Sequence, residues 1–404
     1  MNVIGIVGEY NPFHFGHEYH IKMSRERLGE DSAVICAMSG DYVQRGEAAM
    51  YSKFARAEAA CRGGVDLVLE LPLPWVLSSA EGFARGAVAL LSAAGATHLS
   101  FGSEAGETGP LEELAGLLVT PEINEEIKAV LAQDASLSYA AARQKAVAAR
   151  LGSRAALLET PNNILAVEYL KAIKTLGVPL APMTVARRGA AHDDASGGAG
   201  YRSAMEIRRF ISQGMEAGSF VPTGAAAVYA RERDCGRELA GEERMDLAIL
   251  SRLRMLDRAA FDALPDASGG AGARLYEAAR TQPSLNAVLA AAKTKRYAMS
   301  RVRRMCMCAA LGVRAEMSTG TPPYIRVLAA NARGCALLRQ MNDREDGLPV
   351  VTKPASVKNL SADHEALFAL GASAHDLYVL GYRAEGERKG GEDWRNSPKI
   401  VNNP

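Results

Sequence analysis

Residues 1–20 read MNVIGIVGEYNPFHFGHEYH, and this stretch decides the fold that the rest of the chain supports. Residues 2–7 are apolar and partly β-branched, which is the composition of a strand buried on both faces of a parallel sheet. Gly8 and the Asn11-Pro12 pair then break regular structure, and residues 18–23 have helical character. The sequence therefore predicts a buried strand that turns directly into a helix.

His14 and His17 stand three residues apart at the start of this predicted helix, and His20 follows at the same spacing. The N-terminus of a helix offers unpaired N–H groups and a partial positive charge, which attract phosphate oxygens. Histidines add side-chain donors, and Gly16 lets a flat ligand approach the backbone because it has no Cβ. The spacing alone leaves three interpretations open: a phosphate site, a metal site and ordinary structural histidines. A metal site is the weakest, since no carboxylate or cysteine pattern nearby completes a ligand set.

The first 220 residues otherwise alternate between strand and helix patterns. Four further stretches have the composition of strands: residues 32–38, 65–72, 97–101 and 179–187. Ser52 is placed to cap one of the intervening helices, and Ser78 with Glu81 to form a capping box for the next. Asn162 or Asn163 is the predicted N-cap of a later helix. The alternation predicts an α/β fold with a parallel sheet.

Residues 110–151 interrupt this alternation with Ala- and Leu-rich helical periodicity, which predicts a helical insertion. We expect a first domain over residues 1–220 and, because strand patterns become scarce, a mostly α-helical second domain over residues 221–404. Short late strands are indicated within residues 349–360 and 376–380. The polar residues after 384 are expected to form a mobile tail.

Loops at the carboxyl edge of the predicted sheet are where ligands gather in open α/β folds. The loop after the second strand contains Asp41, Gln44 and Arg45, and the loop after the fourth begins at Gly102. Composition alone favours a solvated loop with an internal ion pair for the first of these. Substrate contacts by the same side chains are the alternative interpretation.

The composition and net charge of the chain limit the classes of partner that it could bind. The chain has 404 residues, 23% charged residues and a formal net charge of +1, so we expect no DNA and no membrane partner, and any RNA-binding surface must be local. The six cysteines form no CxxC pair, which is typical of reduced thiols. We expect a soluble, cytoplasmic protein, since the sequence shows no basic leader and no apolar run of membrane-spanning length.

The string Gly8-Glu9-Tyr10-Asn11-Pro12-Phe13-His14-Phe15-Gly16-His17 resembles the HxGH signature of the nucleotidyltransferase superfamily, which shares its ATP-binding corner with class I aminoacyl-tRNA synthetases. Its long form is similar to one branch in particular, the bacterial tRNA(Met) cytidine acetate ligase family. A Gly-Asp-aromatic-Val-Gln-Arg-Gly run like that at residues 40–46 also occurs in this family. The resemblance implies a Rossmann-like nucleotidyltransferase domain, and it turns the interpretation of the Asp41 loop toward substrate contacts.

The resemblance also implies a site. His14, His17 and Asp41 are the predicted catalytic residues. The predicted ATP-binding residues are Val7, Gly8, Glu9, Tyr10, Asn11, Pro12, Phe13, His14, Gly16, His17, His20, Gly102, Asn162, Asn163, Arg187, Arg188, Ser203 and Arg208. Mg²⁺ is expected to accompany ATP, although the sequence shows no all-protein metal cage.

The segment from Ser203 to Arg208 has two compatible interpretations. Ser203 and Glu206 are spaced as a capping box, which explains both residues by local structure alone. The segment also resembles the Ser-Ser/Ala-Thr-x-Ile-Arg motif of nucleotidyltransferases, whose helix N-terminus and arginine hold the ATP phosphates. Met205 stands where that motif has a small hydroxyl residue, which removes one expected phosphate contact.

A basic cluster lies in the predicted second domain. Six basic residues fall within residues 293–304, together with one tyrosine: Lys293, Lys295, Arg296, Arg301, Arg303 and Arg304. Such a run is commonly a solvated face, but on a nearly neutral chain a basic patch with an aromatic residue is also typical of an RNA contact. We therefore predict that these six residues bind tRNA.

The activity that the resemblance implies is a tRNA-modifying ligation. ATP and acetate form acetyl-adenylate and pyrophosphate, and N4 of the wobble cytidine (position 34) of elongator tRNA(Met) then takes the acetyl group, giving N4-acetylcytidine. One rival is an enzyme of the same fold that moves AMP or CMP onto a small phosphorylated metabolite, which leaves the basic cluster unexplained. A second rival is a non-catalytic RNA-binding or scaffold protein with a relict nucleotide fold, against which intact His14, Gly16, His17 and Arg208 argue.

Overall fold

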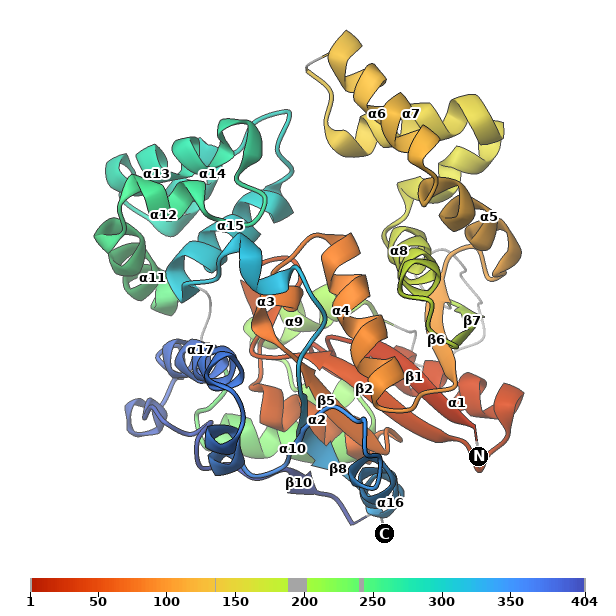
Figure 1. Ribbon diagram of the computed structural model, residues 1–404. Coiled ribbons are helices and arrows are strands. Elements are labelled where there is room, and N and C mark those ends of the chain that lie inside the picture. Colours follow the sequence, from red (N-terminus) through yellow and green to blue (C-terminus); the bar gives the residue numbers. More distant parts are fainter. Residues whose placement is uncertain (1, 135, 188–201, 240–242, 403–404) are drawn as a thin grey trace.

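One mostly parallel sheet organises the molecule (Figure 1). The computed structural model describes residues 2–134, 136–187, 202–239 and 243–402. The strands of this sheet are β1 (Val3–Gly8), β2 (Ala33–Ser39), β5 (Leu67–Leu71), β6 (His98–Ser103), β7 (Ala181–Ala186), β8 (Ile325–Ala330), β9 (Val350–Val351) and β10 (Lys399–Ile400). Their order is β10-β8-β5-β2-β1-β6-β7, with β9 also paired to β8. β1 lies in the interior of this order, so its carboxyl end opens at the middle of one edge.

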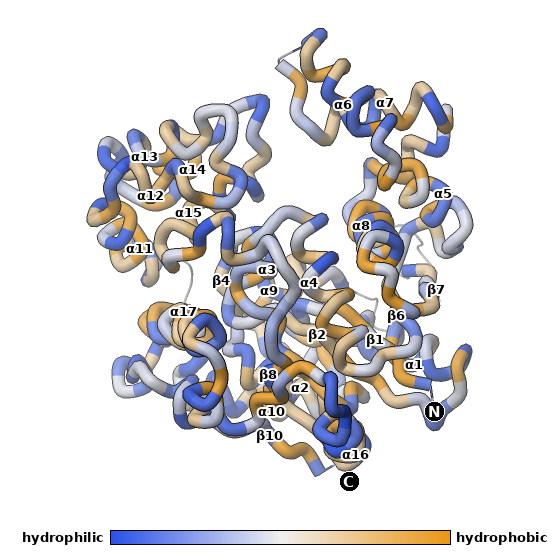
Figure 2. Tube along the Cα trace, in the orientation of Figure 1, coloured by the Kyte–Doolittle hydropathy of each residue, from blue (hydrophilic) through white to orange (hydrophobic). Residues whose placement is uncertain are grey.

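Alternate side chains of β1 and β2 face opposite sides of the sheet, as the pleat of a strand requires. Val3 and Ile35 pack on one side against helices α4 (Ala80–Ala93), α8 (Pro161–Leu176) and α16 (Ala332–Asn342). Ile4 and Val34 pack on the other side against α1 (Phe15–Leu28), α2 (Lys53–Arg62), α9 (Ala204–Ser212) and α10 (Thr223–Asp234). Figure 2 shows the hydrophobic residues of α4 and α8 over the sheet. The predicted α/β fold is confirmed.

Two groups of helices stand on opposite sides above the sheet (Figure 1). The insertion, residues 109–159, consists of α5 (Gly109–Leu118), α6 (Pro121–Gln133), α7 (Tyr139–Leu151) and the 3₁₀ helix Gly152–Glu159. The helical module, residues 243–311, consists of α11 (Glu243–Met255), α12 (Arg258–Asp262), α13 (Ala271–Thr281), α14 (Leu285–Ala292) and α15 (Met299–Leu311). The predicted helical character of both regions is confirmed.

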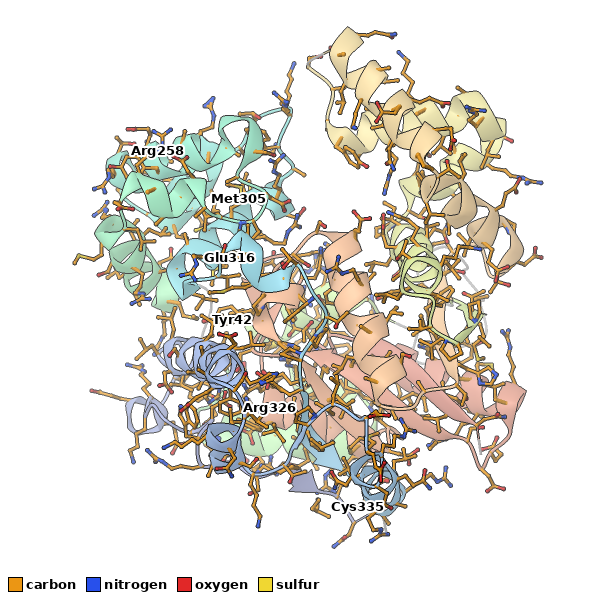
Figure 3. All side chains as sticks on the ribbon, in the orientation of Figure 1. Tyr42, Arg258, Met305, Glu316, Arg326 and Cys335 are labelled. Atoms are coloured by element: carbon orange, nitrogen blue, oxygen red, sulfur yellow. The ribbon has the colours of Figure 1, made fainter. Side chains whose placement is uncertain are left out.

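The loop after β2 contains regular structure that the sequence did not predict. Its hairpin consists of β3 (Tyr42–Val43) and β4 (Glu47–Ala48), which pair antiparallel. A short helix, α3 (Leu73–Val76), follows β5. Tyr42 is wholly buried, its hydroxyl donates to the Ala374 carbonyl at 3.2 Å, and it belongs to the same apolar cluster as Met305 of the helical module (Figure 3).

The division of the chain near residue 221 stays a prediction, but the sheet itself extends past it. β8 pairs antiparallel with β5, and β9 and β10 pair parallel with β8. The strand indicated within residues 349–360 is present as β9, whereas residues 376–380 lie in and just after α17 (Ala362–Val379). Short apolar runs are shared by strands and buried helices, which explains this error and the failure to predict β8.

The expected mobile tail is wrong for the residues around Asp393. That side chain is wholly buried, and its carboxylate accepts hydrogen bonds from Lys53 Nζ at 2.6 Å and from Arg326. Figure 3 places Arg326 low in the molecule, at β8. Polar composition suggested solvent, but a buried carboxylate is stable when buried cations pair with it.

Two predicted helix caps are wrong by one to three residues. Ser79, not Ser78, accepts the hydrogen bond at the start of α4, from Gly82 N at 3.3 Å. The Ser78 hydroxyl instead donates to the Trp75 carbonyl at 2.6 Å. Helix α8 begins after Thr160 without a side-chain cap, so Asn162 and Asn163 lie in its first turn and their amides are available for other contacts.

Candidate active site

His14 and His17 form a reciprocal cap at the start of α1. The His14 Nδ1 atom accepts from Gly16 N at 3.0 Å, and the His17 Nδ1 atom accepts from His14 N at 3.2 Å. The rings stack with centroids 3.8 Å apart. Since both Nδ1 atoms are acceptors, each neutral imidazole carries its proton on Nε2. The cap therefore leaves the Nε2–H of both rings as donors for a ligand.

These imidazoles are neutral near pH 7. Burial and then the charge of Arg187 lower the pKa of His14 to about 4. Burial, His14 and Arg187 hold the pKa of His17 well below its ordinary value. Burial and Arg187 also lower the pKa of His20 to about 4. The corner thus presents uncharged donors beside an arginine, which suits an anionic ligand that arrives with its own charge.

The glycines of the motif make room for neighbouring side chains. A Cβ on Gly16 would lie 2.9 Å from His14 Cε1, and a Cβ on Gly8 would lie 2.9 Å from the Tyr10 ring. The sequence predicted that Gly16 would open the backbone to a flat ligand and that helix N–H groups would hold phosphate. The His14 ring takes both the space and the Gly16 N–H, so the imidazoles are the available donors.

The turn between β1 and α1 is built from buried side chains. β1 ends at Val7 and Gly8, and Tyr10, Asn11, Pro12 and Phe13 follow in the turn; the side chains of Tyr10, Asn11 and Phe13 are almost fully buried. The Asn11 side chain accepts from Met50 N, and Phe13 N donates to the Tyr229 hydroxyl, both at 2.8 Å. The buried side chains of this turn therefore shape the corner, which we define as residues 7–20, and the ATP contacts predicted for these residues stay a prediction.

A second wall comes from the ends of β6 and β7 and the start of α8. Arg187 Nη1 donates to Asn162 Oδ1 at 3.0 Å, and a Cβ on Gly102 would lie 3.3 Å from Arg187 Cγ. Asn163 is buried and its amide oxygen accepts from Glu104 N and Ala105 N at 3.0 Å. Asn162 thus aims Arg187 toward the corner, whereas Asn163 fixes the loop after β6.

The remaining predicted ATP-binding residues differ in the hydrogen bonds that their side chains make within the protein. The Ser203–Glu206 capping box is present, with the Ser203 hydroxyl donating to Glu206 at 2.7 Å. Arg208 Nη1 donates to the Asn11 carbonyl at 2.7 Å and so braces the turn. His20 Nε2 lies 2.8 Å from Ser100 Oγ, which engages its ring. Arg188 lies outside the described residues.

Asp41 is placed away from solvent and in another network. Its carboxylate accepts from Lys53 N at 2.8 Å and lies 2.9 Å from His375 Nδ1. Lys53 also binds Glu70 at 2.9 Å. Together these groups form a buried ion cluster, which we define as Asp41, Lys53, Glu70, Arg326, His375, Glu392 and Asp393. The geometry thus gives Asp41 a structural partner set, and its predicted catalytic role stays a prediction.

Two kinds of residue were missed by the sequence analysis. The ion cluster joins residues that lie far apart in the chain, so no local pattern could reveal it. Arg56 is wholly buried and donates to the carbonyl oxygens of Glu9, Ser39 and Gly40 at the carboxyl edge. A buried arginine inside an apparently ordinary helix has no distinguishing local signal.

The described residues contain no group of three or more His, Cys, Asp or Glu side chains that could hold a metal ion. His14 and His17 stack and cap the helix instead of converging on one point. The same part of the chain has no helix long and apolar enough to cross a membrane.

The structure divides the predicted tRNA-binding set into two halves. Lys293, Lys295 and Arg296 are exposed in the loop between α14 and α15. The other three make internal contacts: Arg301 donates to the Asp266 carbonyl, Arg303 pairs with Glu47, and Arg304 is buried and pairs with Asp266.

Comparisons with known proteins identify the family of the chain. Residues 1–393 match the family model of the HIGH Nucleotidyl Transferase. The tRNA(Met) cytidine acetate ligase of Syntrophotalea carbinolica is 38% identical over 87% of this chain and 85% of the relative, and that of Syntrophomonas wolfei is 33% identical over 98% and 99%. Crystal structures of Thermotoga maritima TmcAL, apo and bound with alpha-thio ATP, cover 100% of both chains with TM-scores of 0.92 and 0.90 at 31% and 30% identity. The chain belongs to the HIGH nucleotidyl transferase family and, within it, to the family of the tRNA(Met) cytidine acetate ligases.

Proposed function

We propose that the chain is an ATP-dependent ligase that activates acetate as acetyl-adenylate and transfers the acetyl group to N4 of the wobble cytidine of elongator tRNA(Met). The observation that carries this proposal is the pair of imidazoles at the corner, whose cap leaves both Nε2–H groups for a ligand beside Arg187. The names of the relatives and the ATP analogue in a solved neighbour support it.

In the first step an acetate oxygen attacks the α-phosphorus of ATP and pyrophosphate leaves. Both reactants are anionic, so the step needs donors that hold the phosphates while the carboxylate approaches in line. His14 and His17 donate from Nε2, and Arg187 supplies positive charge from the second wall, at the end of β7. Mg²⁺ bound with ATP would neutralise phosphate charge, and the described residues contain no group of three or more His, Cys, Asp or Glu side chains that would hold it.

In the second step the cytidine N4 attacks the acetyl carbon, the bond to AMP breaks and the nitrogen loses a proton. The base must reach an activated acetyl group at the carboxyl edge of the sheet. Anticodon-loop nucleotides can leave their stack, so the wobble base is accessible in a way that a paired base is not. Acetate supplies the acetyl group, and acetyl-CoA is not required.

The tRNA contact is assigned to the exposed loop of the helical module. Lys293, Lys295 and Arg296 are solvent-facing there. The module, residues 243–311, carries twelve Lys and Arg against six Asp and Glu, whereas the insertion, residues 109–159, carries five against seven. Because positive charge attracts RNA phosphates, the helical module is favoured over the insertion as the RNA-binding surface. Arg301, Arg303 and Arg304 support this loop from within.

The activity is tested by incubating the protein with labelled acetate, ATP and total bacterial tRNA, followed by nucleoside analysis. We expect label in N4-acetylcytidine, with AMP and pyrophosphate as products. Labelled tRNA that lacks N4-acetylcytidine, or no labelled tRNA at all, would contradict the proposal. Nucleotide transfer to a small phosphorylated metabolite would then support the first rival.

The RNA contact is tested by replacing Lys293, Lys295 and Arg296 together with alanine. We expect tRNA affinity to fall at least about tenfold and its salt dependence to flatten by about two to three units of slope. The matched control removes three cations from the insertion, Lys128, Lys145 and Arg154, and should change tRNA affinity by less than about twofold. Equal losses from both triple variants would contradict the assignment to the module.

A further inference from the structure

The hairpin β3–β4 is joined to the corner through its turn, which contains Gln44, and through Met50, which follows β4. Gln44 N donates to Glu9 Oε1, and Met50 N donates to Asn11 Oδ1, both at 2.8 Å. Glu9 and Asn11 belong to the turn that carries the histidines. These two hydrogen bonds hold the hairpin in a fixed position relative to the corner.

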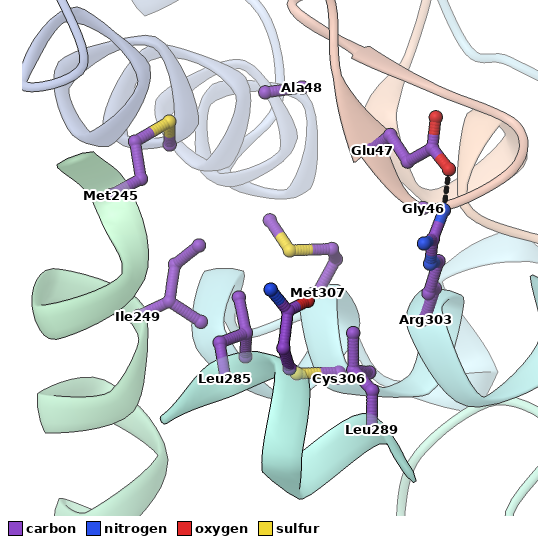
Figure 4. Close-up of a pocket in the computed structure, with 11 residues that line it drawn as sticks. Gly46, Glu47, Ala48, Met245, Ile249, Leu285, Leu289, Arg303, Cys306 and Met307 are labelled. Carbon is purple, nitrogen blue, oxygen red and sulfur yellow. Dashed lines mark ion pairs between the residues drawn. The ribbon is translucent and has the colours of Figure 1, made fainter. Parts of the chain in front are cut away.

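The tip of the same hairpin sits on helix α15 of the helical module. Gly46 has a φ of 76°, and a Cβ there would lie 2.5 Å from Arg304 N and 2.6 Å from Arg303 C. Only glycine permits both this conformation and this approach of two backbones. Beside it the Glu47 carboxylate pairs with the Arg303 guanidinium (Figure 4). The hairpin thus touches the module through one glycine and one ion pair, beside the apolar cluster that contains Tyr42.

The packing around this contact is incomplete. A cavity of about 40 Å³ lies next to the ion pair, and its apolar lining includes Ala48, Ile249, Leu285 and Met307 (Figure 4). A cavity of this volume has room for at least one water molecule, so the apolar side chains around it are not closely packed. Next to this gap in the apolar packing, Gly46 and the Glu47–Arg303 pair are the contacts that fix the hairpin against α15.

We propose that Gly46 and the Glu47–Arg303 ion pair are positioning residues that hold the tRNA-bearing module in register with the acetyl-adenylate. The inference rests on the proposed function. Helix α15 begins directly after the loop of Lys293, Lys295 and Arg296, so the position of α15 sets where the bound tRNA lies relative to the corner. Transfer needs the cytidine nitrogen and the acetyl carbon at reacting distance, and a misplacement of about 1 Å can lower a rate by about 100-fold.

The test separates three readouts in Glu47→Gln: acetate-dependent pyrophosphate exchange, tRNA affinity, and single-turnover acetyl transfer at saturating tRNA. We expect exchange and affinity to stay within about twofold of the wild type and the transfer rate to fall at least about tenfold. The charge swap Glu47→Arg with Arg303→Glu should recover part of the transfer rate. The control Glu126→Gln breaks the comparable ion pair with Arg150 in the insertion and should leave all three readouts unchanged.

Gly46→Ala is the second variant and should lower the transfer rate further, because its Cβ forces the two backbones apart. Wild-type transfer by Glu47→Gln would overturn the inference, as would a parallel loss of tRNA affinity or of exchange. A charge swap that is no better than Glu47→Gln would also overturn it. Failure of the wild type to acetylate tRNA would instead overturn the proposed function itself.

Discussion

Buried histidines are neutral in one region of this molecule and positively charged in another. At the corner, burial and Arg187 lower the pKa of His14 and His20 to about 4, so these imidazoles are neutral. In the ion cluster, burial also disfavours the charge of His375, but Asp41, together with hydrogen bonds to Asp41 and Glu392, raises its pKa to about 10. Burial acts in the same direction in both places, and the sign of the neighbouring charge decides the outcome.

The two states serve different tasks. Neutral imidazoles beside an arginine provide donors for a ligand that brings its own negative charge. A charged imidazole between carboxylates instead fastens α17 and the C-terminal segment to the sheet, where Asp393 also binds Lys53 and Arg326. The corner is thus prepared for a ligand, and the cluster is complete without one.

The largest expected effect comes from breaking the cluster. Asp393→Asn leaves Lys53 and Arg326 as buried cations with less compensation, so we expect the free energy of unfolding to fall by about 3–5 kcal/mol in urea titrations. The control is Glu385→Gln, an exposed carboxylate of the same segment. A loss below about 1 kcal/mol in Asp393→Asn would show that the cluster does not fasten the C-terminal segment.

The next largest expected effect is a pH dependence of the free energy of unfolding, caused by the charge of His375. Its pKa is about 10 in the folded protein against about 6.5 when unfolded, so its stabilisation is complete below about pH 6.5 and is lost as the pH rises toward 10. We expect the wild type to lose roughly 2–4 kcal/mol more than His375→Gln between pH 6.5 and 9.5. Parallel pH profiles of the two proteins would contradict a charged His375.

At the corner the expected effect is on rate and not on stability. His17→Ala removes one Nε2–H donor and should lower acetate-dependent pyrophosphate exchange by about 100-fold or more, with tRNA affinity nearly unchanged. His98→Ala, at the amino end of β6, is the matched control. Wild-type exchange by His17→Ala would remove this ring from the site, and loss of tRNA binding would indicate a fold defect.

The smallest effect is on proton binding, and we expect almost none. Both Nδ1 atoms accept from backbone N–H groups and the pKa of both rings is lowered, so a second proton on either ring would break the cap. Calorimetry of ATP binding at pH 6.5 in buffers of different ionisation enthalpy should therefore show the same proton uptake for the wild type and for the double variant His14→Gln with His17→Gln. A larger uptake by the wild type than by the double variant would show that ATP charges these rings.

Local patterns predicted the parts of the fold that local physics determines. Strand composition located β1, β2, β5, β6 and β7, and the three-residue spacing of Ser203 and Glu206 predicted a capping box that is present. The reciprocal cap of His14 and His17 has the same spacing, but its chemical consequence was not predicted. Which nitrogen carries the proton depends on the hydrogen bond at the other, and only the geometry gives that.

Long-range pairs explain what the sequence could not predict. Asp41 was expected at a substrate loop, yet its partner His375 lies 334 residues away along the chain. The contact of Gly46 with Arg303 and Arg304 likewise leaves no periodic pattern. Three of the six predicted tRNA-binding cations have internal partners for the same reason, because composition counts charges without locating their counter-ions.

The most direct test of the account is the charge of each imidazole, measured by NMR of ¹⁵N-histidine-labelled protein between pH 5.5 and 8.5, with signals assigned by single His→Gln variants. We predict that His14 and His17 are neutral with the proton on Nε2 both without and with ATP, and that His375 is doubly protonated throughout. Titration of the corner histidines near their ordinary pKa without ATP, or a neutral His375, would contradict it.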